Sequence, residues 1–180
     1  MDNAVFDIIK CVLTGVFVSR AVIQDIKEYK IKNKLVLAML LSGLVLRTVF
    51  GGVSGLLGGL GGMLIPLALF PLFVLRMIGA GDIKALCAIG AVLGVRDSIW
   101  FTVISIIAGG VTAVFFVILR KNASERLNRL ITYLKVSLMS RSLPEYSNHF
   151  EESAVFRFSY GIAGGYLVYV IMVIIKYLGG

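Results

Sequence analysis

Hydrophobic residues fall into six long runs along the chain, separated by segments that carry most of the charge. The runs cover residues 4–19, 35–50, 55–75, 83–95, 98–119 and 154–177. A helix rises about 1.5 Å per residue, so about 20 apolar residues cross the roughly 30 Å hydrocarbon core of a membrane. The pattern therefore predicts an all-α integral membrane protein, a polytopic bundle of about six transmembrane helices in a single domain over residues 1–180.

The first and fourth runs differ from ordinary spans. The first follows Asp2 rather than a basic cluster and reaches Arg20 without a small-residue cleavage site. We therefore expect it to be retained as a span instead of being removed as a signal peptide. The fourth run provides only about 20 Å of helix, so its amino-terminal end, residues 79–82, is expected at a water-accessible edge or in a region lined by protein.

Composition and charge agree with a membrane protein and give it an orientation. Hydrophobic residues make up 58% of the chain and charged residues 16%, whereas soluble domains hold about 25% charged residues. Most Lys and Arg residues lie in segments 20–34, 76–84 and 120–157, which share one side if there are six spans. The positive-inside rule assigns these segments to the cytoplasm and both termini to the outside. Topology and contact with anionic lipid account for the net charge of +8, and no nucleic-acid partner is predicted.

The cytoplasmic loop between the fifth and sixth runs, residues 120–153, contains a predicted amphipathic helix. Residues 122–125, Asn-Ala-Ser-Glu, have the form of a capping box. Apolar residues then recur at helical spacing, with basic residues off that stripe: Leu127, Leu130, Ile131, Leu134 and Leu138 against Arg126, Arg129 and Lys135. Such a helix lies on membrane lipid at the inner leaflet or contacts a partner protein.

The topology sorts the acidic residues by side. Asp7 and Asp97 are expected toward the outer face, where Arg96 offers Asp97 an ordinary surface partner. Asp25, at the start of the first cytoplasmic connection, and Asp82, which opens the fourth run, are separated by two spans, so both fall at the cytoplasmic face and can meet.

Two carboxyl groups held close together support a specific chemistry. They share one proton and titrate as a pair. The ionised member can take a proton from water while the protonated member polarises a peptide carbonyl, without a metal or a nucleophilic side chain. The alternative is that Asp82 caps the fourth helix and that Asp25 is a solvated loop charge.

Two motifs resemble those of type IV prepilin peptidases. Residues 79–84, Gly-Ala-Gly-Asp-Ile-Lys, and the small-residue run 85–94 resemble the GxGD-(V/I)-K signature and its trailing helix. Asp25 with residues 31–33, Ile-Lys-Asn, resembles the first-aspartate motif, in which an Asp precedes an Ile-Pro-Asn turn. The two motifs agree with the family in order, spacing and sidedness.

The resemblance implies a membrane aspartic endopeptidase of the prokaryotic cytoplasmic membrane. It would remove the short, positively charged leader of a prepilin-like precursor at the cytoplasmic face, cutting after a glycine and before the hydrophobic helix of the precursor. Asp25 and Asp82 would be the catalytic pair. Gly79 and Gly81 would let backbone come close to the substrate or to a partner helix. Lys84 would be a supporting residue of the GxGD motif, and Asn33 a supporting residue of the first-aspartate motif. No cofactor is implied.

The chain departs from the family pattern in several places. Lys32 stands where the family commonly has proline, which predicts a less rigid turn. Cys11 and Cys87 are far apart and lie in apolar runs, so neither a zinc site nor a disulfide is expected. The extra domain of the methylating members has no counterpart, so we expect cleavage without methyl transfer. The segment 156–165 resembles the closing aromatic and small-residue segment of the family, without its usual proline.

Glycine-rich stretches predict close helix contacts. Gly55, Gly58, Gly59 and Gly62 form two overlapping small-residue ridges in the third run. Gly161, Gly164 and Gly165 are expected to pack against another helix in the last run.

Three other functions use the same features differently. A small proton- or cation-coupled transporter could use the same carboxylates, but the chain lacks the second Gly/Pro-interrupted segment of repeat-built transporters. A presenilin-like protease shares GxGD, but has a tyrosine before its first aspartate where this chain has Gln24. A non-catalytic assembly factor would not need the carboxylates.

Overall fold

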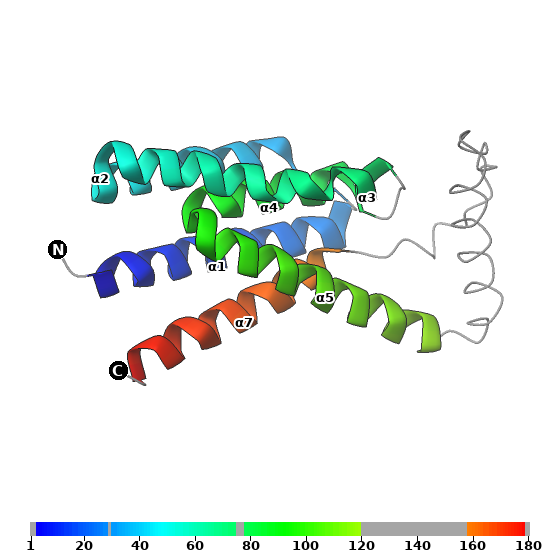
Figure 1. Ribbon diagram of the computed structural model, residues 1–180. Coiled ribbons are helices and arrows are strands. Elements are labelled where there is room, and N and C mark those ends of the chain that lie inside the picture. The colour runs from blue at the N-terminus through cyan, green and yellow to red at the C-terminus, as the bar shows by residue number, and fades with distance from the viewer. Residues whose placement is uncertain (1–2, 29, 75–77, 120–157, 179–180) are drawn as a thin grey trace. The chain divides into compact units, whose positions relative to one another are not determined.

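The computed structural model describes residues 3–28, 30–74, 78–119 and 158–178, and most of these residues are in helices, with no strand among them. In chain order the elements are α1 (Asn3–Glu28), α2 (Asn33–Leu64), a 3₁₀ helix η1 (Ile65–Leu69), α3 (Phe70–Val74), α4 (Ala80–Leu93), α5 (Val95–Leu119) and α7 (Ser159–Leu178), as Figure 1 shows. Met1–Gly110 and Arg157–Gly180 form one compact unit, to which the following contacts belong. The predicted amphipathic helix falls outside the described residues.

Three helical stretches have the length and apolar composition to cross a membrane: Asn33–Val74, Val95–Phe115 and Ser159–Leu178. The protein is thus an all-helical membrane protein over its described part, as the hydrophobic runs predict. The total of six spans stays a prediction, because α1 carries several charged residues and α4 has 14 residues.

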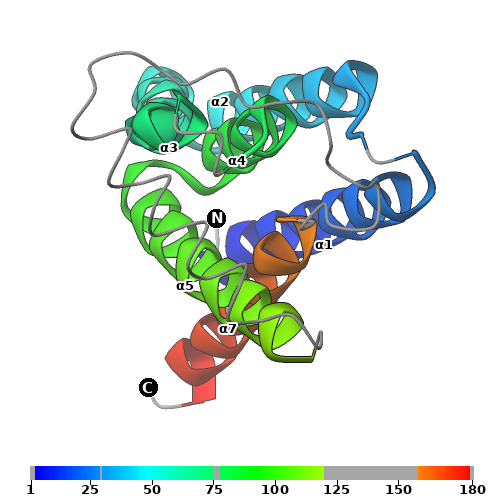
Figure 2. The same ribbon diagram turned by 90° about the vertical axis from the view of Figure 1, so that its right-hand side faces the viewer.

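The first of these stretches turns back on itself at Gly52. Gly52 has φ 56° and ψ −141°, a conformation that favours glycine because it has no Cβ. Beyond the turn the two halves of α2 pack closely, since a Cβ on Gly55 would lie 2.0 Å from the carbonyl oxygen of Arg47. Figures 1 and 2 both show the two halves side by side. The turn falls in the interval that the sequence predicts between the second and third hydrophobic runs.

Helix α4 is enclosed by protein. Residues 85–93 are all buried. Its Gly90 meets Gly62 of α2 so closely that a Cβ on either glycine would lie 2.2 Å from the carbonyl oxygen of the other. Ser98 of α5 donates a hydrogen bond of 2.8 Å to the Gly62 carbonyl. This enclosure explains how the fourth hydrophobic run can be short, because a protein-lined helix need not match the lipid thickness.

Helix α7 packs through small residues against α5 and α1. A Cβ on Gly161 would lie 2.7 Å from the backbone of Gly109, and one on Gly165 would lie 2.1 Å from the Ser105 hydroxyl. On the α1 side, the Tyr166 hydroxyl donates to the carbonyl of Cys11 at 3.2 Å. These contacts confirm the predicted close packing of the last hydrophobic run.

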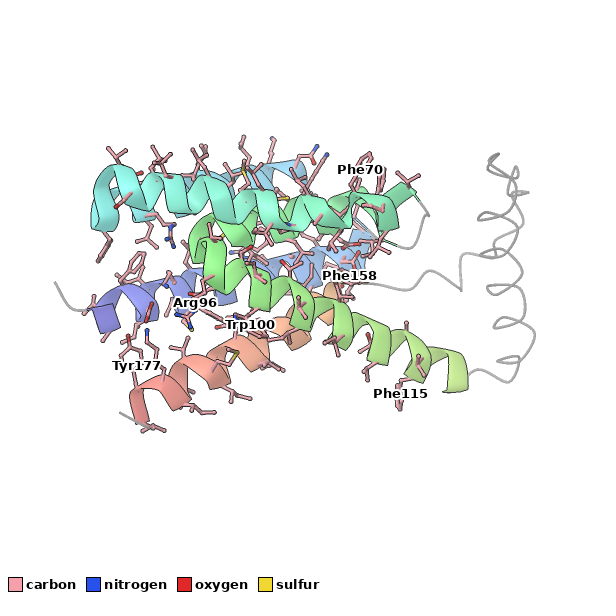
Figure 3. All side chains as sticks on the ribbon, in the orientation of Figure 1. Phe70, Arg96, Trp100, Phe115, Phe158 and Tyr177 are labelled. Carbon is pink, nitrogen blue, oxygen red and sulfur yellow. The ribbon has the colours of Figure 1, made fainter. Side chains whose placement is uncertain are left out.

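An ion cluster joins three helices at one end of the bundle. Asp7 of α1 contacts Lys10 at 2.7 Å and Lys176 of α7 at 2.7 Å, and accepts a hydrogen bond of 2.8 Å from Tyr177. Lys10 also reaches Asp97 of α5 at 3.4 Å. Asp7 and Asp97 therefore do share one end, as predicted, but the salt-bridge partner of Asp97 is Lys10 rather than the adjacent Arg96. Figure 3 shows the Arg96 and Tyr177 side chains toward this end.

The cluster predicts a large difference between two Asp→Ala substitutions. Asp7→Ala leaves the buried Lys10 ammonium without its closest carboxylate, and breaking a buried pair costs about 3 kcal/mol or more. Asp97→Ala removes a longer contact from a more exposed carboxylate and should cost about 1 kcal/mol or less. Thermal unfolding in detergent micelles checks this. A melting temperature of Asp7→Ala equal to that of wild type would show that the cluster does not stabilise the bundle.

Candidate active site

Asp25 is buried near the end of α1, three residues before the helix ends at Glu28. Its Oδ2 atom accepts a hydrogen bond of 2.5 Å from the hydroxyl of Ser159, the first residue of α7. Ser159 is fully buried. Asp25 thus lies within a helix and contacts another, and the alternative of a solvated loop charge is wrong.

Asp82 lies in the first turn of α4, just before the apolar run 83–95. Gly79 is the N-cap residue of this helix, so Asp82 occupies the third helical position. The carboxylate of Asp82 accepts a hydrogen bond from the backbone N–H of Gly79. This is the half of a capping box in which an acidic side chain reaches back to the N-cap amide. The capping interpretation of Asp82 is therefore correct, and it leaves the second carboxylate oxygen for other contacts.

The fold brings Asp25 and Asp82 close enough for their charges to interact. Burial and the nearby charge of Asp25 raise the pKa of Asp82 to about 6, against the opposing hydrogen bond from Gly79. Burial and a like charge both disfavour a second negative charge at one site. Asp82 therefore holds a proton more tightly than an isolated aspartate does.

The two motif glycines have different surroundings. A Cβ on Gly79 would lie 3.0 Å from Oδ2 of Asp82, so a side chain there would press on the carboxylate. A Cβ on Gly81 would meet nothing within 4 Å. The other two motif residues, Lys84 and Asn33, are exposed. A side chain at position 79 would thus require the Asp82 carboxylate to shift slightly, whereas position 81 has open space beside it.

Three contacts hold the turn after Asp25, where the family pattern has proline. The backbone N–H of Lys32 donates to Oε1 of Gln24 at 3.1 Å, and the Lys32 ammonium pairs with Glu28 at 2.6 Å. Ile31 is buried. Lys32 itself has φ −69°, the angle that a proline ring imposes. The turn therefore has a proline-like backbone that hydrogen bonding and burial maintain.

Ser159 is the one residue of this site that the sequence patterns did not single out. In the sequence, Ser159 is one residue of the closing segment 156–165 and has no role of its own. A signal for it existed, because a polar residue at the start of the sixth run falls at the cytoplasmic end by the topology that pairs Asp25 with Asp82. Among the described residues, no group of three or more His, Cys, Asp or Glu side chains could hold a metal ion.

The model of a known protein family matches residues 12–114, more than half of the chain, and the match includes both Asp25 and Asp82. The chain belongs to the type IV leader peptidase family. Membership of this peptidase family makes the protein a membrane-embedded protease, and it agrees with the family that the two aspartate motifs resemble. Comparisons with curated proteins and with solved structures each gave no match.

We expect this leader peptidase to fold with proline at position 32, because the turn after Asp25 already has a proline-like backbone conformation. Lys32→Pro fits the observed φ and reduces the entropy of the unfolded chain, which stabilises by about 0.4–1 kcal/mol. It also removes a solvent-exposed hydrogen bond of about 0.5–1.5 kcal/mol, so the melting temperature should change little.

The matched control is Leu37→Pro, an exposed position inside α2 where proline costs about 3 kcal/mol. Thermal unfolding in detergent compares the two variants. If Lys32→Pro lowers the melting temperature of the protein as much as Leu37→Pro does, then the turn depends on the hydrogen bond to Gln24 and not on the φ angle of residue 32.

Proposed function

We propose that this protein is an aspartic endopeptidase that removes the leader peptide from type IV prepilin-like precursors, with Asp25 and Asp82 as its catalytic pair. One observation carries the proposal: within the residues matched by the leader peptidase family, two carboxyl groups from α1 and α4 lie close enough for one to raise the pKa of the other. Perturbed carboxyl pairs are typical of catalytic sites.

The pair would hydrolyse a peptide bond by activating water. A water molecule between the carboxyl groups gives a proton to the ionised carboxylate and attacks the carbonyl carbon of the scissile bond. The protonated carboxyl donates its proton to the carbonyl oxygen, where negative charge would otherwise develop. Collapse of the resulting diol breaks the C–N bond, and the leaving nitrogen takes a proton from the pair. No metal or covalent intermediate is needed.

Two features fit a peptide substrate that has a hydrophobic helix. The open space beside Gly81 would let an extended peptide backbone reach Asp82. Asp25 lies about 27 Å along α1 from the ion cluster at Asp7, so the pair sits near one end of the bundle. We place this end at the cytoplasmic face of a prokaryotic cytoplasmic membrane, with both termini outside, because of the distribution of Lys and Arg. The helix of the precursor would then lie in lipid while its leader reaches the pair.

The rival proposal is a proton- or cation-coupled transporter that uses the same carboxylates. Family membership favours the peptidase, and both proposals require Asp25 and Asp82. Leader removal is therefore the observation that separates them.

The first test replaces each aspartate by asparagine. Asp25→Asn and Asp82→Asn should each lower leader cleavage by at least about 100-fold, because neither amide can exchange the proton that the reaction needs. Asp82→Asn keeps an acceptor for the Gly79 amide, so the cap of α4 survives. Because burial disfavours the charged carboxylate, this variant should be at least as thermally stable as wild type above pH 6.

The assay is co-expression with a candidate prepilin, scored by the mobility shift of the processed product. Asp97→Asn, at the other end of the bundle, is the control and should cleave normally. Normal cleavage by either Asp25→Asn or Asp82→Asn would rule out the paired-carboxylate mechanism.

The second test is the pH dependence. The pair needs one proton, and Asp82 holds it below a pKa of about 6 and loses it above. The second-order rate constant kcat/KM should therefore fall as pH rises through about 6 in purified enzyme acting on a precursor peptide. A profile that rises steadily from pH 5 to pH 8 would contradict a required proton on this pair.

A further inference from the structure

The environments of the two carboxyl groups are unequal. Asp25 accepts the 2.5 Å hydrogen bond from Ser159, a residue 134 positions later in the chain. Asp82 accepts a hydrogen bond from the backbone amide of Gly79. Burial and the nearby charge of Asp25 favour the protonated form of Asp82. The shared proton is therefore expected on one member of the pair.

The Ser159 hydroxyl donates to Asp25, so Asp25 is placed as a hydrogen-bond acceptor. A hydroxyl that donates to a carboxylate stabilises the ionised form, and such bonds are short, in the range of about 2.5–2.7 Å. Ser159 is fully buried, so no solvent competes for its hydroxyl. It is also the first residue of α7, where the positive end of the helix dipole adds to the same effect.

We propose that Ser159 is a positioning residue whose hydrogen bond to Asp25 makes Asp25 the proton acceptor of the pair and leaves Asp82 as the proton donor. This inference rests on the proposed function. Asp25 takes the proton from the attacking water, and Asp82 gives its proton to the carbonyl oxygen. When the diol collapses, Asp25 returns its proton to the leaving nitrogen as the C–N bond breaks, and one diol hydroxyl returns a proton to Asp82. The cycle ends with Asp25 ionised and Asp82 protonated, as it began.

A purely structural role for Ser159 is the competing explanation. Its hydroxyl could do no more than satisfy the buried carboxylate and dock α7 on α1. That role predicts a loss of folded protein or of substrate affinity, whereas the proposed role predicts a loss of turnover by enzyme that is folded and saturated with substrate.

The chain offers a matched control for Ser159→Ala. Ser105 of α5 is also a fully buried serine that contacts α7, through Gly165, and its hydroxyl has no hydrogen-bond partner among the described residues. Ser105→Ala removes the same atom from the same kind of site without touching Asp25. A second variant, Ser159→Cys, nearly keeps the volume of serine and replaces the hydroxyl by a weaker donor.

The experiment measures kcat and KM for a synthetic precursor peptide with purified enzyme in detergent, after thermal unfolding has shown that each variant is folded. Ser159→Ala should lower kcat by about 10- to 100-fold with KM unchanged, as loss of a hydrogen bond to a charged group implies. Ser159→Cys should fall between wild type and Ser159→Ala, and Ser105→Ala should equal wild type. If Ser159→Ala does not fold, the kcat of Ser159→Cys decides.

A kcat equal to wild type in the folded Ser159 variants, or a change confined to KM, would overturn the inference. That result leaves the proposed function intact as long as Asp25→Asn and Asp82→Asn are inactive. If those two variants cleave normally, the proposed function itself is wrong, whatever Ser159 does.

Discussion

An ionised side chain buried in an apolar bundle needs partners, and this requirement organises both ends of the protein. At one end Asp7 lies between Lys10 and Lys176, so its negative charge is compensated by cations. At the other end the partners that the structure describes for Asp25 and Asp82 are a hydroxyl, a backbone amide and each other. The first arrangement is what a stable ion cluster needs. In the second, burial and the charge of Asp25 raise the pKa of Asp82, and a carboxyl group with a raised pKa is suited to proton transfer.

The position of Asp82 depends on the packing of α4. Because Gly62 and Gly90 let the α2 and α4 backbones touch, and Ser98 bonds to the same Gly62 carbonyl, α4 is held from two sides. The fold-back of α2 at Gly52 makes room for this contact by doubling the helix over α4. A rigid, buried helix can present its first turn in a fixed geometry, and that first turn carries the carboxylate.

The sequence predicts the helices and the acidic pair well because each leaves a local or topological signal. Hydrophobic runs mark the helices, and counting spans places Asp25 and Asp82 on one side, whereas the positive φ of Gly52 at the fold-back of α2 is seen only in the structure. The sequence does not predict which buried group finds which partner. Lys10 with Asp97 and Asp25 with Ser159 join residues 87 and 134 positions apart, and such contacts depend on helix rotation, which periodicity does not determine. The helical extension of α1 to Glu28 is also missed, because its last residues lie outside the hydrophobic run and carry polar and charged side chains.

The two glycines of the residue 79–82 motif show how one short sequence can serve folding and chemistry together. The backbone amide of Gly79 caps α4 through Asp82, and a Cβ at this position would press on the same carboxylate. Gly81 has no such explanation within the described residues, because a side chain there would meet nothing. Gly81 is the second residue of α4, so its lack of a side chain leaves the first turn of the helix open beside Asp82. Under the proposed function, the open backbone beside Asp82 gives room for the close approach of a substrate backbone.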